Sequence, residues 1–335
     1  MSRSLLLILI FVFFSNCTPN KSEVALDENR INVQEVKTAR EISTKQSRVE
    51  QEFNSSLEVI VQGGKFKKNP LNNQNNIGEL SYNGNLKKIG KYKFSKFDDF
   101  EYLDVQPIFY NEYIIFFDKK GTIILYDQNQ KVIWEKNFYS KNEKKLRPRL
   151  NFARHNDILI VTDDIAKYYA IDIETGDVIW SKNNTVPFNS EIKIKDDFFY
   201  TVDYKNILRS ISIIDGKEIW SFKTEESLTK SNTKISVVIE KDNVYFNNSI
   251  GDITAVNIRS GQLVWQLPTQ NNNISKNAFH LSSSKLVIDE GSILFSNNRN
   301  EFYSIDTITG LINWKNEINS NLRPVVIDKL IITVS

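Results

Sequence analysis

Cysteine, histidine, methionine and tryptophan are scarce in this chain of 335 residues, which contains one Cys, two His, one Met and five Trp. The single cysteine, Cys17, excludes an intramolecular disulfide, because a disulfide needs two thiols. The two histidines, His155 and His280, lie far apart in the sequence, and no Cys/His cluster has zinc-binding spacing. The net charge of +2 argues against a nucleic-acid binder, which usually carries a strongly basic face.

Motifs that carry catalytic or phosphate chemistry are also missing. Neither the G-x-x-x-x-G-K-[ST] nor the G-x-G-x-x-G pattern of phosphate-binding loops occurs. Two aspartate pairs, Asp163 with Asp164 and Asp196 with Asp197, fall at predicted strand ends. We interpret these pairs as solvated turn carboxylates in preference to calcium ligands. The sequence therefore predicts no catalytic, cofactor or metal site.

The five tryptophans mark an internal repeat. Their spacings are 46, 40, 45 and 49 residues, and the positions are Trp134, Trp180, Trp220, Trp265 and Trp314. A period of about 45 residues built from short strands indicates a β-propeller in which each repeat forms one four-stranded antiparallel blade. We predict that each Trp is largely buried and packs against the turn of the next blade.

Each repeat also has a predicted turn ahead of its Trp. A glycine stands four residues before four of the tryptophans, as Gly176, Gly216, Gly261 and Gly310. Eight residues before these tryptophans stand Asp172, Ser212, Asn257 and Asp306, whose side chains bond nearby backbone groups in turns. A second turn is predicted fourteen residues before, at Ala166, Asn206, Gly251 and Asn300. The first copy is one residue shorter and has Gln130 in place of the glycine.

A further strand precedes the second turn in every repeat. These strands are predicted at residues 114–117, 158–161, 198–201, 244–246 and 293–295. A less regular strand precedes each of them and often opens near a proline, as at Pro107, Pro148 and Pro324, where Pro is tolerated at a strand's first residue. The repeat therefore contains four strands, which is one blade.

Residues 1–16 have the features of a signal peptide. Arg3 supplies a positive start, and the apolar run from Leu5 to Phe14 is too short to span a bilayer. Phe14-Ser15-Asn16-Cys17 is similar to a bacterial lipobox, so we expect cleavage before Cys17 and acylation of that residue. Ordinary secretion with an incidental cysteine is the alternative. The residue after Cys17 is Thr18. By the bacterial sorting rule for lipoproteins, the absence of Asp at this position implies the outer membrane.

Residues 17–80 are polar and are interpreted as a flexible tether, and residues 81–335 as the propeller. The alternating range 86–94 is expected to form a strand that completes the last blade. Near the end, Leu322-Arg323-Pro324 resembles Leu146-Arg147-Pro148. We therefore expect a sixth blade to start at the later of these two segments. Five full blades and an incomplete sixth predict that the natural chain continues beyond Ser335.

The repeating Asp-x-x-x-Gly-x-x-x-Trp units resemble those of pyrroloquinoline-quinone-type propellers. Together with the lipobox and the polar tether, they resemble the BamB family of outer-membrane assembly lipoproteins. That resemblance implies an eight-bladed, non-enzymatic propeller on the periplasmic face of the outer membrane. It further implies a monomer within a complex, where it binds the barrel insertase BamA and helps to present unfolded outer-membrane proteins.

The resemblance also implies where the partner binds. In the family, loops after the third and fourth blades contribute, so Leu228 and Lys230 are candidate contact residues here. Related quinone dehydrogenases hold their cofactor between a Trp and a disulfide of adjacent cysteines, which this chain cannot form. A periplasmic propeller that binds a glycan or a quinone remains the alternative function.

Two basic clusters are present in the sequence. One lies after the first blade and the other on the first strand; their members are Lys141, Lys144, Lys145, Arg147 and Arg149, and Lys87, Lys88, Lys91 and Lys93. A solvated face is one interpretation of these clusters, and contact with anionic lipid headgroups is the other.

Overall fold

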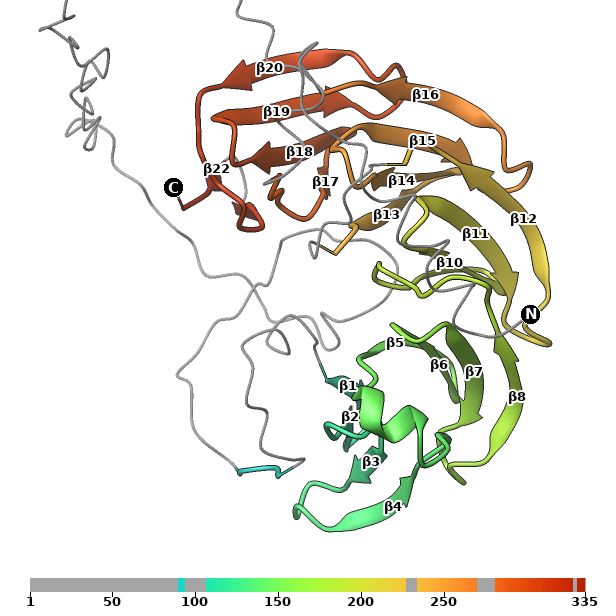
Figure 1. Cartoon of the computed structure of the whole chain (residues 1–335). Coiled ribbons are helices and arrows are strands. Elements are labelled where there is room, and N and C mark those ends of the chain that lie inside the picture. The colour runs from blue at the N-terminus through green and yellow to red at the C-terminus, as the bar shows by residue number, and fades with distance from the viewer. Residues whose placement is uncertain (1–89, 94–106, 227–233, 270–280, 328–329, 335) are drawn as a thin grey trace, which may run out of the picture. The chain divides into compact units, whose positions relative to one another are not determined.

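The computed structural model describes residues 90–93, 107–226, 234–269, 281–327 and 330–334, all within the compact unit 60–335 (Figure 1). The regular structure of these residues is a series of strands and one short 3-10 helix, η2 (Glu143–Leu146). The strands form five four-stranded antiparallel sheets and a two-stranded C-terminal hairpin. The prediction of an all-β propeller with four-stranded blades is confirmed.

The sheets follow one another in chain order. Sheet 1 contains β1 (Ile108–Tyr110), β2 (Tyr113–Phe117), β3 (Ile123–Tyr126) and β4 (Val132–Lys136). Sheet 2 contains β5 (Leu150–His155), β6 (Ile158–Asp163), β7 (Lys167–Asp172) and β8 (Val178–Asn183). Sheet 3 contains β9 (Lys193–Lys195), β10 (Phe198–Val202), β11 (Ile207–Ser212) and β12 (Glu218–Lys223).

The remaining elements continue the same arrangement. Sheet 4 contains β13 (Val237–Glu240), β14 (Asn243–Asn247), β15 (Ile253–Asn257) and β16 (Leu263–Leu267). Sheet 5 contains β17 (Val287–Asp289), β18 (Ser292–Asn297), β19 (Glu301–Asp306) and β20 (Ile312–Asn316). The C-terminal hairpin contains β21 (Val325–Ile327) and β22 (Leu330–Ile332).

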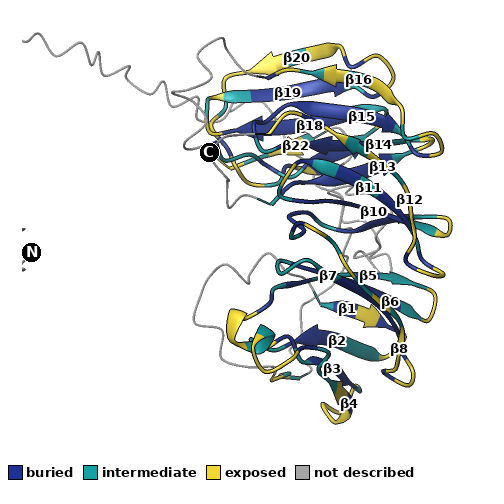
Figure 2. Cartoon of the chain, turned by 45° about the vertical axis from the view of Figure 1, so that its right-hand side comes forward, coloured by how far each residue is buried: buried dark blue, intermediate teal, exposed yellow. Residues whose placement is uncertain are grey.

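Neighbouring sheets pack face to face and share a core. Side chains alternate between the two faces of a strand, so a central strand serves two cores. In β10, Phe199 packs with residues of sheet 2, whereas Tyr200 and Val202 pack with residues of sheet 4. The second and third strands of each sheet are buried, and exposure is concentrated on the fourth strands (Figure 2).

Four of the tryptophans connect their sheet to the next one by a hydrogen bond. Trp180 Nε1 donates a hydrogen bond of 2.7 Å to the carbonyl oxygen of Ile213, in the β11–β12 turn of the following sheet. The same bond recurs from Trp134, Trp220 and Trp265 to the carbonyl oxygens of Ile173, Ile258 and Thr307. The expected docking of each ring on the next turn is therefore present for these four residues.

The predicted glycines make this docking possible. Gly216 has a φ of +66°, and a Cβ atom there would lie 2.6 Å from Cε3 of Trp180. Gly176, Gly261 and Gly310 meet Trp134, Trp220 and Trp265 in the same way. Glycine is required because the backbone is left-handed and the ring of the preceding tryptophan occupies the space of a side chain.

Burial of the tryptophans varies from sheet to sheet. Trp134 is buried, but Trp180, Trp220, Trp265 and Trp314 have intermediate exposure. Each lies on the fourth strand of its sheet, at the periphery, so one part of the ring covers the turn while another part reaches solvent. Trp314 packs instead against Phe302 of its own sheet, with ring centroids 5.3 Å apart.

A second set of turns joins the second and third strands. The predicted turn residues Ala166, Asn206, Gly251 and Asn300 all have positive φ. An Asp or Asn at the end of the second strand organises most of these turns: Asp163 Oδ1, for example, accepts hydrogen bonds from the backbone N–H groups of Ile165 and Lys167. Asp118, Asp203 and Asn248 make equivalent pairs of bonds.

The expected strand at 86–94 is described only at residues 90–93, and these form no strand. They contact the β3–β4 region of sheet 1 instead. The backbone N–H of Lys91 donates to Oε1 of Gln130, and the hydroxyl of Tyr126 donates to the carbonyl oxygen of Lys93. Side-chain partners therefore replace a backbone ladder at this point.

Candidate functional site

The candidate site consists of two loops that join neighbouring sheets. The first, which we name loop A, connects β12 of sheet 3 to β13 of sheet 4, and the second, loop B, connects β16 of sheet 4 to β17 of sheet 5. Leu228 and Lys230 of loop A lie outside the described residues, as does the range 270–280 of loop B. The structure describes the bases of both loops, and these show how the loops are held.

Asn206 fixes the start of loop A. Its amide Nδ2 donates to the carbonyl oxygen of Glu225 at 2.6 Å and to Oγ of Ser249 at 2.8 Å. Its Oδ1 accepts a hydrogen bond of 3.1 Å from the backbone N–H of Ser249. Since Ser249 lies in the β14–β15 turn of sheet 4, one buried side chain ties loop A to the next sheet.

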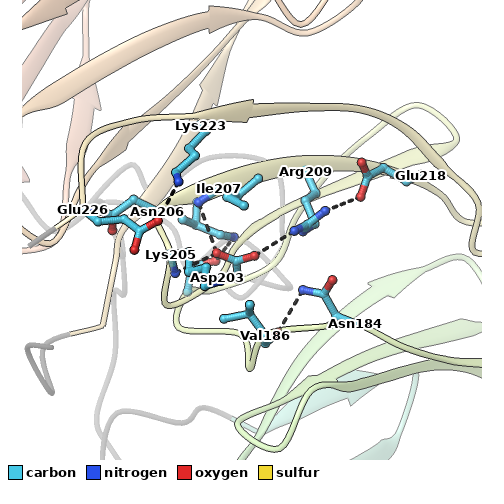
Figure 3. Close-up of polar contacts among 12 residues, drawn as sticks. Asn184, Val186, Asp203, Lys205, Asn206, Ile207, Arg209, Glu218, Lys223 and Glu226 are labelled. Atoms are coloured by element: carbon cyan, nitrogen blue, oxygen red, sulfur yellow. Dashed lines mark hydrogen bonds and ion pairs between the residues drawn. The ribbon is translucent and has the colours of Figure 1, made fainter.

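A partly buried ion-pair chain connects the strands that lead to loop A (Figure 3). The guanidinium of Arg209 lies 2.9 Å from Oδ2 of Asp203 through Nη2 and 2.5 Å from Oε2 of Glu218 through Nη1. Asp203 is fully buried, so a cation beside it is required. Burial by itself lowers the pKa of Arg209, but hydrogen bonds to both carboxylates outweigh that effect and raise it.

The first residues of loop A also carry charge at the surface. Lys223 and Glu226 form an exposed ion pair with 2.7 Å between Nζ and Oε1. An exposed pair of this kind contributes about 0–1 kcal/mol to stability. Figure 3 shows the pair beside Asn206, at the point where the described chain leaves β12.

The end of loop A is hydrogen-bonded to residues that precede it in the chain, in sheets 2 and 3. The backbone N–H of Ile235 donates a 2.8 Å hydrogen bond to the carbonyl oxygen of Asn189, in the segment that connects β8 to β9 of sheet 3. Nζ of Lys234 donates to Oδ1 of Asn151 on β5 at 2.9 Å. Loop A is therefore fixed to sheet 4 at its start and to sheets 2 and 3 at its end.

Loop B has an anchored base of the same kind. Thr269 donates from its backbone N–H to Oδ1 of Asp252 and from Oγ1 to the carbonyl oxygen of Gly251. Leu281, at the other end, packs against Gly251, where a Cβ atom would lie 2.7 Å from Cδ2 of the leucine. Burial raises the pKa of Asp252, and the hydrogen bond from Thr269 opposes that rise.

The loop that follows sheet 1 holds the first basic cluster. It includes η2, in which no residue is buried, and Leu146 is 65% exposed between Lys145 and Arg147. Glu143 connects this loop to sheet 2: it accepts a hydrogen bond from the backbone N–H of Ser140 and forms an ion pair with Lys167 on β7. The backbone N–H and the hydroxyl of Ser140, followed by the ammonium of Lys167, lower the pKa of Glu143 to about 2.

The interpretation of the aspartate pairs as solvated turn carboxylates is wrong for Asp163, whereas Asp196 and Asp197 are exposed as expected. Asp163 is fully buried, and its Oδ2 accepts a 2.7 Å hydrogen bond from the hydroxyl of Tyr139. Burial raises the pKa of Asp163 to about 6, although hydrogen bonds from Tyr139, Lys167 and Ile165 oppose the rise. The turn it organises is packed against the core, and the sequence pattern alone does not distinguish such a turn from a solvated one.

The other sequence candidates stay apart. Nε2 of His155 lies 3.8 Å from Oδ1 of Asp197. Cys17 and His280 fall outside the described residues. No cluster of three or more His, Cys, Asp or Glu side chains able to hold a metal occurs in the part of the chain that the structure describes. Among the same residues, no helix is long and apolar enough to cross a membrane.

Four-stranded antiparallel sheets that are joined by tryptophan rings define a β-propeller of the pyrroloquinoline-quinone repeat class. The family model described as outer membrane protein assembly factor BamB matches residues 119–335. The chain belongs to this family.

Relatives in sequence are distant. An uncharacterized protein of Rickettsia conorii is 19% identical over 252 residues, which cover 73% of this chain and 60% of the relative. The outer membrane protein assembly factor BamB of Francisella tularensis is 25% identical over 127 residues, covering 36% of this chain and 25% of that protein. The chain thus spans about 60% of the length of the rickettsial relative.

Solved structures agree on the fold. BamB from Moraxella catarrhalis superposes with a TM-score of 0.55 at 14% identity, with 66% of each chain covered. A europium-containing methanol dehydrogenase superposes with a TM-score of 0.52 at 10% identity, covering 63% of this chain and 50% of the enzyme. At these identities the likeness concerns the fold alone.

Proposed function

We propose that this protein is a non-enzymatic, lipid-anchored scaffold of the outer membrane. In this role it binds a BamA-like barrel insertase and assists the insertion of unfolded outer-membrane proteins as one component of a complex. The observation that carries the proposal is the match of residues 119–335 to the BamB family. Loops A and B are the proposed contact surfaces, with Leu228 and Lys230 of loop A as contact residues.

The anchoring of the loop bases supports a binding role. Loop A starts and ends on hydrogen bonds to neighbouring sheets, made by Asn206 and Lys234, and loop B starts on hydrogen bonds from Thr269 to the β14–β15 turn of its own sheet. Loops on a rigid frame are well suited to recognition, because ordering the frame on binding costs little entropy. The tryptophan docking supplies that rigidity.

A non-enzymatic role agrees with the use made of the tryptophans. Four of them donate their Nε1–H to backbone carbonyl oxygens and cover glycine turns, so they serve the packing between sheets. Cys17, the single cysteine, cannot form the cysteine pair that flanks the cofactor in related quinone dehydrogenases.

The N-terminal region completes the proposed arrangement. Residues 1–16 act as the signal peptide, the acylated Cys17 inserts in the periplasmic leaflet of the outer membrane, and residues 17–80 form the tether. Acyl chains stabilise the membrane-bound state by about 0.8 kcal/mol per buried CH₂, so more than one chain gives a durable anchor.

Co-purification with the insertase tests the proposal. A tagged BamA-like insertase from the source bacterium should retain the full chain, and the double variant Leu228→Ala/Lys230→Ala should weaken retention. The matched control is Ile214→Ala/Lys217→Ala, which removes an exposed aliphatic side chain and an exposed lysine from the β11–β12 turn of the same sheet.

The control variant should be retained like the parent. Loss of retention in both double variants would place the contact elsewhere on sheet 3. No retention of the parent chain, together with tight binding of a glycan or a quinone, would overturn the proposal in favour of a ligand-binding propeller.

A further inference from the structure

The loop that joins sheet 1 to sheet 2, residues 137–149, presents cations that no acidic side chain neutralises, and we name it the basic loop. These exposed or half-exposed cations are Lys141, Lys144, Lys145 and Arg147. None of the four side chains forms an ion pair in the part of the chain that the structure describes. Glu143 is the single acid of the loop, and it is already paired with Lys167, with 3.0 Å between Oε1 and Nζ. The basic loop is therefore a concentrated positive surface on a chain whose net charge is only +2.

An apolar side chain stands within this positive surface. Leu146 is 65% exposed between Lys145 and Arg147, and η2 buries none of its residues. Arg147 ends η2 in left-handed backbone, with a φ of +54°, which is unfavourable for a residue that carries a Cβ atom. An exposed leucine flanked by cations combines apolar insertion with charge attraction, the two interactions that hold peripheral segments at an anionic bilayer.

Contacts at both ends hold the basic loop on sheet 2. At its start, the hydroxyl of buried Tyr139 donates a 2.7 Å hydrogen bond to Oδ2 of Asp163. At its end, the backbone N–H of Arg149 donates to Oδ1 of Asp164 at 2.9 Å, and Nε of the arginine lies 3.2 Å from Oδ2 of that aspartate. Both aspartates are engaged by the ends of the loop, so the cations between those ends stay available to a partner.

An extended anionic surface suits these cations better than one small anion. They are spread over seven residues, 141–147, and lie at the surface, where a small anion would have to compete with water at each of them. A plane of lipid phosphates meets several of them at once, and each basic residue near such a plane adds to the binding. The basic loop follows a fourth strand, as loops A and B do, so it leaves the same end of its sheet.

We propose that the basic loop is a contact surface for an anionic phospholipid bilayer, in which the four cations pair with lipid phosphates and Leu146 inserts between the headgroups. This contact would bring the end of the propeller that carries loops A and B toward the membrane. It rests on the proposed function only for the presence of the chain at a bilayer.

Contact quenching by brominated lipid tests the proposal on the full, acylated chain. Leu146→Trp adds an indole to the basic loop and keeps an apolar side chain there. The matched control is Ile308→Trp, since Ile308 is 69% exposed and lies in the β19–β20 turn, at the other end of its sheet. The vesicles contain brominated phosphatidylcholine, alone or with an equal part of phosphatidylglycerol. Phosphatidylglycerol should raise the quenching of the Leu146→Trp chain but not of the control, and high salt should reverse the rise.

Charge variants of the Leu146→Trp chain give the magnitude. Lys145→Gln/Arg147→Gln should lower the ratio of bilayer-bound to unbound loops about 25-fold, which is about fivefold for each cation. Lys217→Gln/Arg259→Gln also removes a lysine and an arginine, both exposed, but from the β11–β12 and β15–β16 turns at the other end of sheets 3 and 4. This control should leave the ratio unchanged.

Flotation of the same samples with phosphatidylcholine vesicles measures the acyl anchor separately, so failure of the anchor and failure of the basic loop are distinguishable. The proposal is overturned if phosphatidylglycerol does not raise the quenching of the Leu146→Trp chain above that of the Ile308→Trp chain, or if the two double variants weaken quenching equally. Retention by the BamA-like insertase that is lost with Lys145→Gln/Arg147→Gln, without quenching by anionic vesicles, would assign the surface to an acidic protein partner instead.

Discussion

Replacing Gly216 by alanine tests the docking of sheets 2 and 3 in isolation. The left-handed backbone at this residue costs a non-glycine residue about 1–2 kcal/mol. The new Cβ would lie 2.6 Å from the Trp180 ring, and relief of such overpacking costs about 1–3 kcal/mol more. Displacement of the ring also weakens the 2.7 Å bond from Trp180 to Ile213, worth about 1 kcal/mol. We expect a total loss of about 3–6 kcal/mol.

Gly291→Ala is the matched control. Gly291 has a φ of +76°, but its nearest neighbour to a new Cβ, Oγ1 of Thr307, would lie at an ordinary 3.8 Å. Only the backbone cost of about 1–2 kcal/mol should remain there. Urea unfolding followed by circular dichroism measures both variants, and adding Trp180→Leu to Gly216→Ala should recover part of the loss. Equal destabilisation by the two glycine substitutions would refute the steric account of docking.

Three further predictions follow from the described contacts. Because the pKa of Asp163 in the folded state, about 6, exceeds its unfolded value, the folded state binds more protons between about pH 4 and pH 6, and stability falls as the pH rises through this window. Asp163→Asn, which copies Asn248 of sheet 4, should remove that fall, and pH-dependent urea unfolding checks it. Arg209→Met should cost about 3–5 kcal/mol by leaving Asp203 buried without its cation, whereas Arg259→Met, from an exposed pair, should cost less than about 1 kcal/mol by the same assay. Cys17→Ser should abolish palmitate labelling and move the protein out of the membrane fraction; a variant that stays in that fraction would show that another element holds it.

The repeat pattern predicted the fold well because each of its features has a local cause. Glycine ahead of the tryptophan, as at Gly216, and a turn residue such as Asn206 both lie in left-handed backbone in the structure. The predicted strand at 198–201 agrees with β10 to within one residue at its end. Gln130 also adopts positive φ, at 65°, so the turn of sheet 1 keeps its geometry without the glycine.

Burial of charge could not be predicted from the sequence in the same way. Asp163 and Asp203 look like surface turn residues, but their turns are covered by packed neighbours, Tyr139 in one case and Arg209 in the other. Glu191 and Lys285, which form a 2.7 Å ion pair, both stand 29 residues before a tryptophan, a coincidence of position that carries information only once the repeat is known to be wound about an axis. Contacts between distant repeats are set by that winding and not by local pattern.

Reconstituted barrel insertion tests the proposed function most directly. Vesicles that contain the BamA-like insertase would receive an unfolded outer-membrane protein, and the rate at which it becomes protease-resistant would be measured with and without the full-length, acylated chain. The proposed scaffold role predicts faster insertion when the chain is present and the parental slow rate when Leu228→Ala/Lys230→Ala replaces it. An insertion rate that is unchanged by the acylated parent chain would contradict the account.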